Sequence, residues 1–212
     1  MAIPRFPVYL FDIDGTLLDS AVDICGAIRQ ALAPHVPDPP PAESLTRFVG
    51  YHLDVCFQEI LPDYSRAQLD DLILSYRTLY LARGHSQTRP YAGALEGLQA
   101  LGGRKGTATT KGTPTTRAIL EQFQFLPFFD HVQGTDGFPC KPEPDILYRC
   151  LAALEASPED CLFVGDSAAD MEAGRRAGVK ICAVRYGYGN HDDMARWEPD
   201  YWISDLRELS RM

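Results

Sequence analysis

The sequence predicts an α/β protein, a Rossmann-like, doubly wound parallel sheet into which an all-helical cap is inserted. Three observations lead to this prediction: an apolar run at residues 8–11 ends in acidic residues, residues 20–85 show helical periodicity without a strand pattern, and strand and helix patterns alternate after residue 90. Strands and helices that alternate in this way form parallel sheets with helices on both faces. We therefore expect a sheet core at 1–18 and 88–212, and a cap at 19–87.

The inserted segment is predicted to contain amphipathic helices. Apolar residues at helical spacing mark a helix at about 20–32 and another at about 53–61, and prolines between them exclude regular structure until about Glu43. A further helix begins with a capping box, in which Ser65 and Gln68 satisfy unpaired backbone amides.

The rest of the chain is predicted to alternate between strands and helices. Strands are expected at about 8–11, 106–110, 128–134, 161–165, 179–185 and 201–206. Helices are expected at about 93–101, from 113 onward, at 143–154, at 168–178 and at the C-terminus. The second strand is expected to be short, because Arg104 and Lys105 should mark its exposed start. A register slip of one residue would put Thr110 in the place of Thr109.

The composition is that of an ordinary globular protein, with 45% apolar and 23% charged residues among 212. The formal net charge of −9 argues against binding to nucleic acid or to an anionic membrane, because both need a basic face. A small anionic substrate stays compatible, since a metal ion or a lysine can outweigh the global field locally.

The six cysteines are scattered and include no C-x-x-C pair, which supports neither a zinc ribbon nor a disulfide framework. The N-terminal apolar run is too short for a signal peptide, and no later segment is apolar enough to span a bilayer. We therefore expect buried thiols in a cytoplasmic protein. The sequence carries no signal for the oligomeric state.

Side chains that could take part in catalysis or in metal binding follow four of the predicted strands. They are Asp12 and Asp14, Thr109 and Thr110, Lys141, and Asp166 with Asp170 one helical turn further on. Ligands of doubly wound sheets bind at the carboxyl ends of the strands, so we expect these side chains to lie together.

This set of side chains suits phosphoryl transfer from a monoester. Carboxylates can hold Mg²⁺, which together with Lys141 would offset the charge of the phosphate and of an attacking carboxylate. One carboxylate can attack phosphorus to form an aspartyl-phosphate, while a second acid protonates the leaving oxygen and then activates water.

The constellation resembles the haloacid dehalogenase superfamily over the whole chain. The stretches "FDIDGTLLDS", "TTKG", "KPEPD" and "GDSAAD" match its four motifs. The resemblance implies that Asp12 is the nucleophile, Asp14 the acid/base, Thr109 a phosphate-binding hydroxyl and Lys141 the lysine of the third motif.

The resemblance also implies a Mg²⁺ ion held by the Asp12 carboxylate, the Asp14 backbone carbonyl and Asp166, with Asp170 supporting these ligands. Within the superfamily, "TRPYAG", "FVGDSAADMEAGRRAGV" and "YGYG" look most similar to phosphoglycolate phosphatases with a helical cap. This implies hydrolysis of a small phosphorylated metabolite, with phosphoglycolate favoured. Another sugar phosphate, a nucleotide or a phosphomutase reaction stays open.

Three other activities fit less well. A dehalogenase needs neither a metal nor a second acid such as Asp14. A phospho-aspartate switch lacks an acid two residues after its phosphorylated aspartate and has no inserted cap. A silent binding module on the same fold would not need the intact acids.

Individual residues also have structural interpretations. Asp166 could cap the following helix, Asp170 could complement the helix dipole, and Lys111 fits a surface charge better than a ligand. For substrate selection, the cap stretch "TRFVGYHLD" offers Arg47, Gly50 and His52. An arginine there could bind a substrate carboxylate, although an ordinary helix terminus fits equally well.

Overall fold

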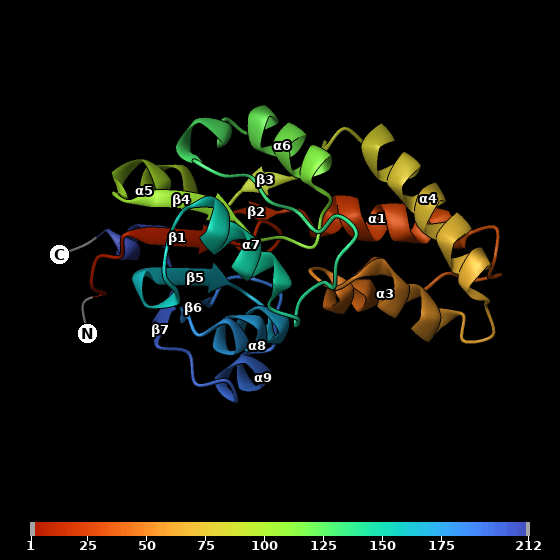
Figure 1. The fold of residues 1–212 in the computed structure, drawn as a ribbon. Helices are drawn as coiled ribbons and strands as arrows, with labels where there is room; N and C mark the ends of the chain where they lie inside the picture. Colours follow the sequence, from red (N-terminus) through yellow and green to blue (C-terminus); the bar gives the residue numbers. More distant parts are fainter. Residues whose placement is uncertain (1–2, 211–212) are drawn as a thin grey trace. The chain divides into compact units, whose positions relative to one another are not determined.

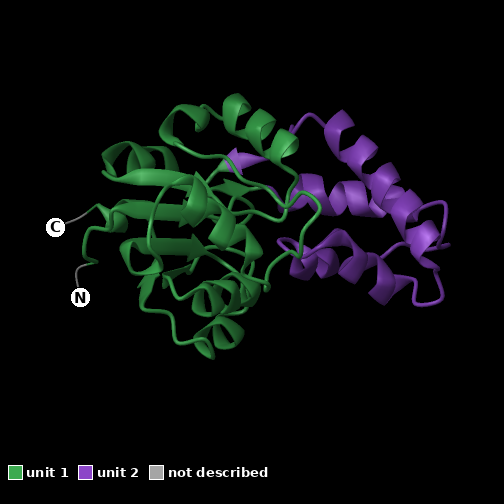
Figure 2. Cartoon of the chain, viewed as in Figure 1, with its two compact units in different colours: residues 1–19, 90–212 green, residues 20–89 purple. Residues whose placement is uncertain are grey.

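The structure is a computed structural model that describes residues 3–210, and the chain divides into two compact units (Figures 1 and 2). One unit comprises residues 1–19 and 90–212, and the other comprises residues 20–89. Two short strands, β2 (Leu18–Asp19) and β3 (Arg89–Pro90), lie where the chain passes between the units. That residues 20–89 act as a cap stays a prediction.

The first unit is built on a five-stranded sheet with the strand order β4-β1-β5-β6-β7, in which every pairing is parallel. The strands are β1 (Val8–Phe11), β4 (Arg104–Thr107), β5 (Cys161–Gly165), β6 (Lys180–Val184) and β7 (Tyr201–Ile203). Phe11 lies opposite both Thr107 and Val164, so neighbouring strands end at about the same level. The predicted doubly wound α/β fold is confirmed.

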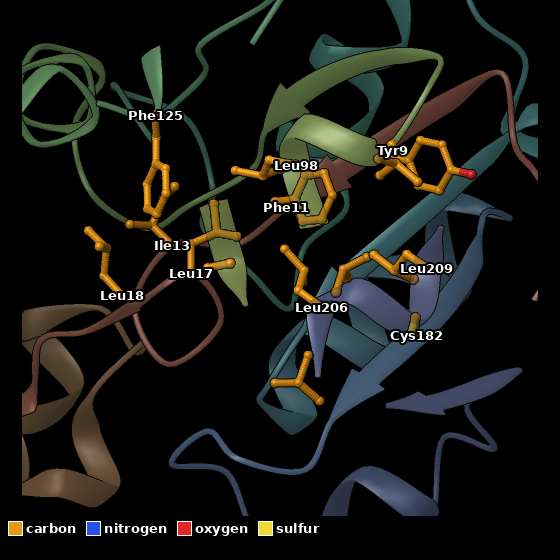
Figure 3. Packing of buried hydrophobic residues seen from close by; sticks show 14 of the residues in the cluster. Tyr9, Phe11, Ile13, Leu17, Leu18, Leu98, Phe125, Cys182, Leu206 and Leu209 are labelled. Carbon is orange, nitrogen blue, oxygen red and sulfur yellow. The ribbon is translucent and has the colours of Figure 1, made fainter. Parts of the chain in front are cut away.

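Helices cover both faces of this sheet, and the pleat of the strands sorts the core residues between the faces (Figure 1). Tyr9 and Phe11 belong to the cluster that Figure 3 shows, together with Leu98 and Leu206. The helices on this side are α5 (Ala94–Ala100), α6 (Thr113–Gln122) and the 3₁₀ helix η4 (Leu206–Leu209).

The other face of the sheet carries a second cluster, to which β1 contributes Val8 and Leu10. The helices on this side are α7 (Asp145–Ala153), α8 (Ala168–Ala177) and α9 (His191–Ala195). Two short 3₁₀ helices, η2 (Leu126–Phe128) and η3 (Pro158–Asp160), complete this unit. Helix α9 was not predicted, and the expected C-terminal helix is the 3₁₀ helix η4.

Strand β4 differs from the prediction, because it begins at Arg104 and its Lys105 is buried rather than exposed. The Lys105 backbone N–H donates to the Asp130 carboxylate at 2.8 Å, and its Nζ donates to the Gly103 carbonyl at 3.1 Å. A long lysine stem can lie along apolar surface while its ammonium group reaches a polar acceptor. The expected strand at 128–134 is replaced by isolated bridges, at His131 and Gly134.

The second unit is built of helices. They are α1 (Ala21–Leu32), α2 (Ala42–Leu45), the 3₁₀ helix η1 (Thr46–Phe48), α3 (Leu53–Ile60) and α4 (Arg66–Ala82). The predicted capping box of Ser65 and Gln68 begins α4 and is confirmed. Within residues 3–210, none of the helices combines the length and the apolar character that crossing a membrane requires.

A buried carboxylate connects the two ends of this helical unit. Asp23 of α1 is 0% exposed, and its Oδ2 accepts hydrogen bonds from the backbone N–H groups of Gln87 and Thr88, both at 2.9 Å, and from Thr88 Oγ1 at 2.8 Å. Its Oδ1 accepts a hydrogen bond from Arg83 Nε at 3.2 Å. Burial alone would raise the pKa of Asp23, but these hydrogen bonds to the charged form lower it.

Replacement of Asp23 should therefore destabilise the protein. We expect Asp23→Asn to lower the free energy of unfolding by about 1–3 kcal/mol at pH 7, because buried N–H groups lose a charged acceptor. The matched control Asp71→Asn, at an exposed position of α4, should change it by less than about 0.5 kcal/mol. Denaturant unfolding of both variants measures the difference.

The effect of Asp23→Asn should also depend on pH. Because folding lowers the pKa of Asp23, its stabilisation is fully present above the unfolded pKa of about 4 and is lost as the pH falls through the folded pKa. The gap between wild type and Asp23→Asn should therefore shrink on acidification below about pH 4. A gap that is absent at pH 7, or that widens in acid, would contradict this account.

Candidate active site

Two adjacent strands of the first unit end in buried acids. Asp12 follows β1 and Asp166 follows β5, and the Asp12 backbone N–H donates to the Val164 carbonyl at 3.0 Å, which extends the ladder between these strands by one residue. Carboxylate oxygens of Asp12, Asp166 and Asp170 lie within 4.8 Å of one another, and all three residues are buried. The ladder thus holds the Asp12 backbone rigidly beside the Asp166 segment.

Lys141 provides a positive charge inside this acidic cluster. Its Nζ lies 2.6 Å from Asp170 Oδ1, 3.0 Å from Asp12 Oδ1 and 2.9 Å from the Ala108 carbonyl oxygen. Burial alone would lower the pKa of Lys141, but Asp12 and Asp170 raise it above its usual value, so the ammonium group stays charged. The structure therefore brings Lys141 and the acids together.

Asp170 is surrounded by donors of its own chain. Its Oδ2 accepts from the Ser167 N–H at 3.0 Å, from Ser167 Oγ at 2.6 Å and from the Asp166 N–H at 3.2 Å, while Oδ1 takes Lys141. Ser167, and not Asp166, is the N-cap of α8, and Asp170 is its partner in a capping box. The alternative interpretation of Asp166 as the helix cap is wrong.

Asp166 is held by two contacts that the sequence analysis did not anticipate. Thr16 Oγ1 donates to Asp166 Oδ1 at 3.1 Å, and the Tyr188 backbone N–H donates to Oδ2 at 2.9 Å. Gly15 has a φ of +84°, and a Cβ at this position would overlap the Asp166 carboxylate. A backbone donor such as the Tyr188 N–H leaves no signal in residue type, so sequence reasoning could not find it.

Asp14 lies against a lysine that the sequence analysis interpreted as a surface charge. Lys111 Nζ is 2.7 Å from Asp14 Oδ2, and the two side chains are only 10% and 4% exposed. The surface interpretation of Lys111 is therefore wrong. Its position just after Thr109, near the carboxyl end of β4, was the signal that could have indicated this role.

Thr109 is fully buried, and its backbone forms a parallel bridge with Gly134. Its Oγ1 accepts a hydrogen bond from the Lys111 N–H at 3.4 Å, whereas Thr110 is partly exposed. The choice of Thr109 rather than Thr110 as the phosphate-binding hydroxyl stays a prediction.

The acidic cluster has too little positive charge of its own. Burial, with smaller contributions from the charges of Asp170 and Asp14, raises the pKa of Asp12 to about 7 against the lowering effect of Lys141. Burial, followed by the charges of Asp170 and Asp12, also raises the pKa of Asp166 well above its usual range. A divalent cation would supply the missing charge, and carboxylate oxygens are suitable ligands for a hard cation.

Known proteins share this sequence pattern and this fold. The sequence pattern of the haloacid dehalogenase-like hydrolase family matches residues 9–184. The chain belongs to this family. A phosphoglycolate phosphatase from Aquifex aeolicus is 31% identical over 209 residues, which cover 97% of this chain and 95% of that protein.

Two further known proteins also match nearly the whole chain. A 5'-nucleotidase from Pseudomonas aeruginosa is 31% identical over 212 residues, which cover 98% of this hydrolase and 96% of that protein. A solved hydrolase of the haloacid dehalogenase-like family from Streptococcus pneumoniae matches with a TM-score of 0.86 at 26% identity, over 96% of each chain. The predicted superfamily and the predicted enzyme class, a hydrolase of the phosphatase type, are confirmed.

The residues expected to select the substrate belong to the helical unit of this hydrolase. The Arg47 guanidinium forms an ion pair with Glu59, and the His52 imidazole lies against the Asp54 carboxylate. Gly50 turns the chain with a φ of +89°. Their role in specificity stays a prediction.

Substitution of Gly15 should displace Asp166. Gly15→Ala forces a side chain into a left-handed backbone and into the Asp166 carboxylate, whereas the control Gly137→Ala has a similar φ of +75° and no atom within 4 Å of its Cβ. Both variants carry the backbone penalty of about 1–2 kcal/mol, and we expect overpacking to cost Gly15→Ala about 1–3 kcal/mol more.

Denaturant unfolding measures this difference, and calorimetric titration with Mg²⁺ measures whether the displaced carboxylate weakens cation binding. Gly15→Ala should lose affinity for the cation relative to Gly137→Ala. Equal stability and equal affinity of the two variants would show that Asp166 tolerates the added methyl group.

Proposed function

We propose that this hydrolase is a Mg²⁺-dependent phosphomonoesterase in which Asp12 receives the phosphoryl group. One observation carries the proposal: a buried ammonium group, Lys141, bridges Asp12 and Asp170 beside Asp166, yet the pKa values of Asp12 and Asp166 are still raised. Such a site has a strong preference for additional positive charge, and it places an attacking carboxylate within it.

Asp12 is the best candidate for the nucleophile among the three clustered acids. Asp166 accepts hydrogen bonds on both carboxylate oxygens, from Thr16 and Tyr188, and the two oxygens of Asp170 bind Ser167 and Lys141. Asp12 instead makes an ion pair with Lys141 at 3.0 Å from the rigid end of β1. Its carboxylate therefore has the least hydrogen bonding to lose when it attacks phosphorus.

The cation would be held by the carboxylates of Asp12 and Asp166 and by the Asp14 backbone carbonyl. Asp170 would support them, because its own oxygens are bound by Ser167 and Lys141. When bound, Mg²⁺ would offset the negative charge of the phosphate and of the attacking carboxylate.

The reaction would proceed in two displacements. In the first, a bond forms between an Asp12 oxygen and phosphorus, the bond from phosphorus to the leaving oxygen breaks, and Asp14 protonates that oxygen. In the second, Asp14 takes a proton from water, the water oxygen attacks phosphorus, and the Asp12 carboxylate is restored as inorganic phosphate leaves. Lys141 and the Thr109 hydroxyl would bind the phosphate oxygens, and residues 20–89 would act as the cap that excludes other water.

The substrate that we propose is phosphoglycolate. The relative from Aquifex aeolicus supports this choice, but the 5'-nucleotidase from Pseudomonas aeruginosa is equally similar, so a 5'-nucleotide is the alternative. A cytoplasmic location fits the six free cysteines, five of which are buried.

The variant Asp12→Asn tests the proposed chemistry. Wild-type protein should hydrolyse p-nitrophenyl phosphate only with Mg²⁺, lose activity with a chelator and regain it on addition of the ion. Asp12→Asn should lower kcat by about 10³-fold or more, because an amide cannot replace the attacking carboxylate. The control Asp192→Asn, at an exposed position of α9, should keep full activity. Turnover without metal, or an active Asp12→Asn variant, would overturn the proposal.

A comparison of substrates tests the proposed specificity. We expect kcat/KM for 2-phosphoglycolate to exceed the values for a 5'-nucleotide and for pyrophosphate by at least about tenfold, a ratio that one or two differential contacts can produce. Steady-state assays of phosphate release measure all three compounds. A higher kcat/KM for the nucleotide would reassign the substrate without affecting the role of Asp12.

A further inference from the structure

Lys111 is a second ammonium group among the acidic residues of the first unit. Its Nζ lies 2.7 Å from Asp14 Oδ2, and its side chain is 10% exposed. Lys141, by contrast, is 1% exposed and is bound by Asp12 and Asp170. The two lysines therefore differ in access: Lys141 is enclosed, while Lys111 keeps part of its side chain open to solvent.

The backbone of Lys111 is held in place by hydrogen bonds on both its N–H and its carbonyl group. Its N–H donates to Thr109 Oγ1 at 3.4 Å, and its carbonyl accepts a hydrogen bond from the Thr135 N–H at 2.8 Å. A lysine ammonium group on a four-carbon stem can exchange one anionic partner for another without a backbone movement.

The position of Lys111 beside Asp14 connects it with the leaving group of the substrate. Under the proposed mechanism, Asp14 protonates the leaving oxygen, so that oxygen must come within hydrogen-bond distance of Asp14. Atoms attached to the leaving oxygen then lie near the Lys111 ammonium group. A negative charge on these atoms would be attracted to it, and a neutral group would not.

We propose that Lys111 selects substrates whose leaving group carries an anionic group, such as a carboxylate, close to the scissile oxygen. This inference rests on the proposed function and extends it to the class of substrate. In the free protein Lys111 pairs with Asp14. With substrate bound, its ammonium group pairs with the substrate anion, which also leaves Asp14 free to face the leaving oxygen.

From the sequence, Arg47 was the residue predicted to bind a substrate carboxylate. Its guanidinium forms an ion pair with Glu59 within the helical unit, and its side chain is 64% exposed. Lys111 is the better candidate, because its partner is the acid proposed to act on the leaving oxygen.

A pair of substrates separates charge recognition from general activity. 2-Phosphoglycolate and ethyl phosphate have leaving groups of similar size, but the first carries a carboxylate where the second carries a methyl group. The ratio of interest is kcat/KM for 2-phosphoglycolate divided by kcat/KM for ethyl phosphate. We expect Lys111→Met to lower this ratio at least tenfold, because methionine removes the charge that attracts the carboxylate. Effects on Asp14 act on both substrates and cancel in this ratio, and Lys111→Arg should restore most of it.

Two further variants provide the controls. Lys180→Met removes a lysine that pairs with Asp200 at 2.9 Å, at the opposite end of β6 from the acidic cluster, and should keep the wild-type ratio. Arg47→Met tests the rival residue and should also keep it.

The outcomes are distinct. An unchanged ratio in Lys111→Met would overturn the inference even if both rates fell, because Lys111 would then act on Asp14 alone. A ratio that falls in Arg47→Met and not in Lys111→Met would also overturn it and assign the selection to the helical unit. Failure of wild type with Mg²⁺ to hydrolyse p-nitrophenyl phosphate would overturn the proposed function itself. Hydrolysis of p-nitrophenyl phosphate but of neither substrate of the pair would overturn the inference alone.

Discussion

The burial of negative charge at the ends of β1 and β5 is the constraint on which the rest of the site depends. Carboxylates of Asp12, Asp166 and Asp170 share one small volume, and Lys141 neutralises only part of their charge. Uncompensated buried charges are strongly unfavourable, so every neighbouring donor contributes to their solvation. The acids destabilise the fold because their negative charge is only partly compensated. The same uncompensated charge is useful to a phosphatase, because it attracts positive charge to the site.

The surrounding fold provides donors at fixed positions. The apolar side chains of β1 alternate between the two clusters and hold the strand between two layers of helices. The two residues before α8 contribute Ser167 and the Asp166 N–H to Asp170, and the loop after β6 contributes the Tyr188 N–H to Asp166. Rigid packing on both faces is thus what keeps the acids close despite their mutual repulsion.

The sequence indicated that the buried acids converge, because their positions follow from topology. Carboxyl ends of parallel strands meet at one edge of a sheet, so Asp12 and Asp166 had to converge once their strands were recognised. Lys105 and Lys111 could not be placed in this way, since the partner of a long flexible side chain depends on tertiary packing and not on local periodicity. The Tyr188 N–H was invisible for a different reason: any residue type presents the same backbone donor.

The Asp23 contacts have a consequence for how such a protein can change over evolutionary time. They tie the beginning of α1 to residues Gln87 and Thr88, so the inserted segment starts and finishes at neighbouring points. An insertion whose two ends meet can be exchanged for another of different length or shape without spreading the host strands apart. The carboxylate in α1 therefore makes residues 20–89 a segment that can be exchanged while the strands of the hydrolytic core stay in place.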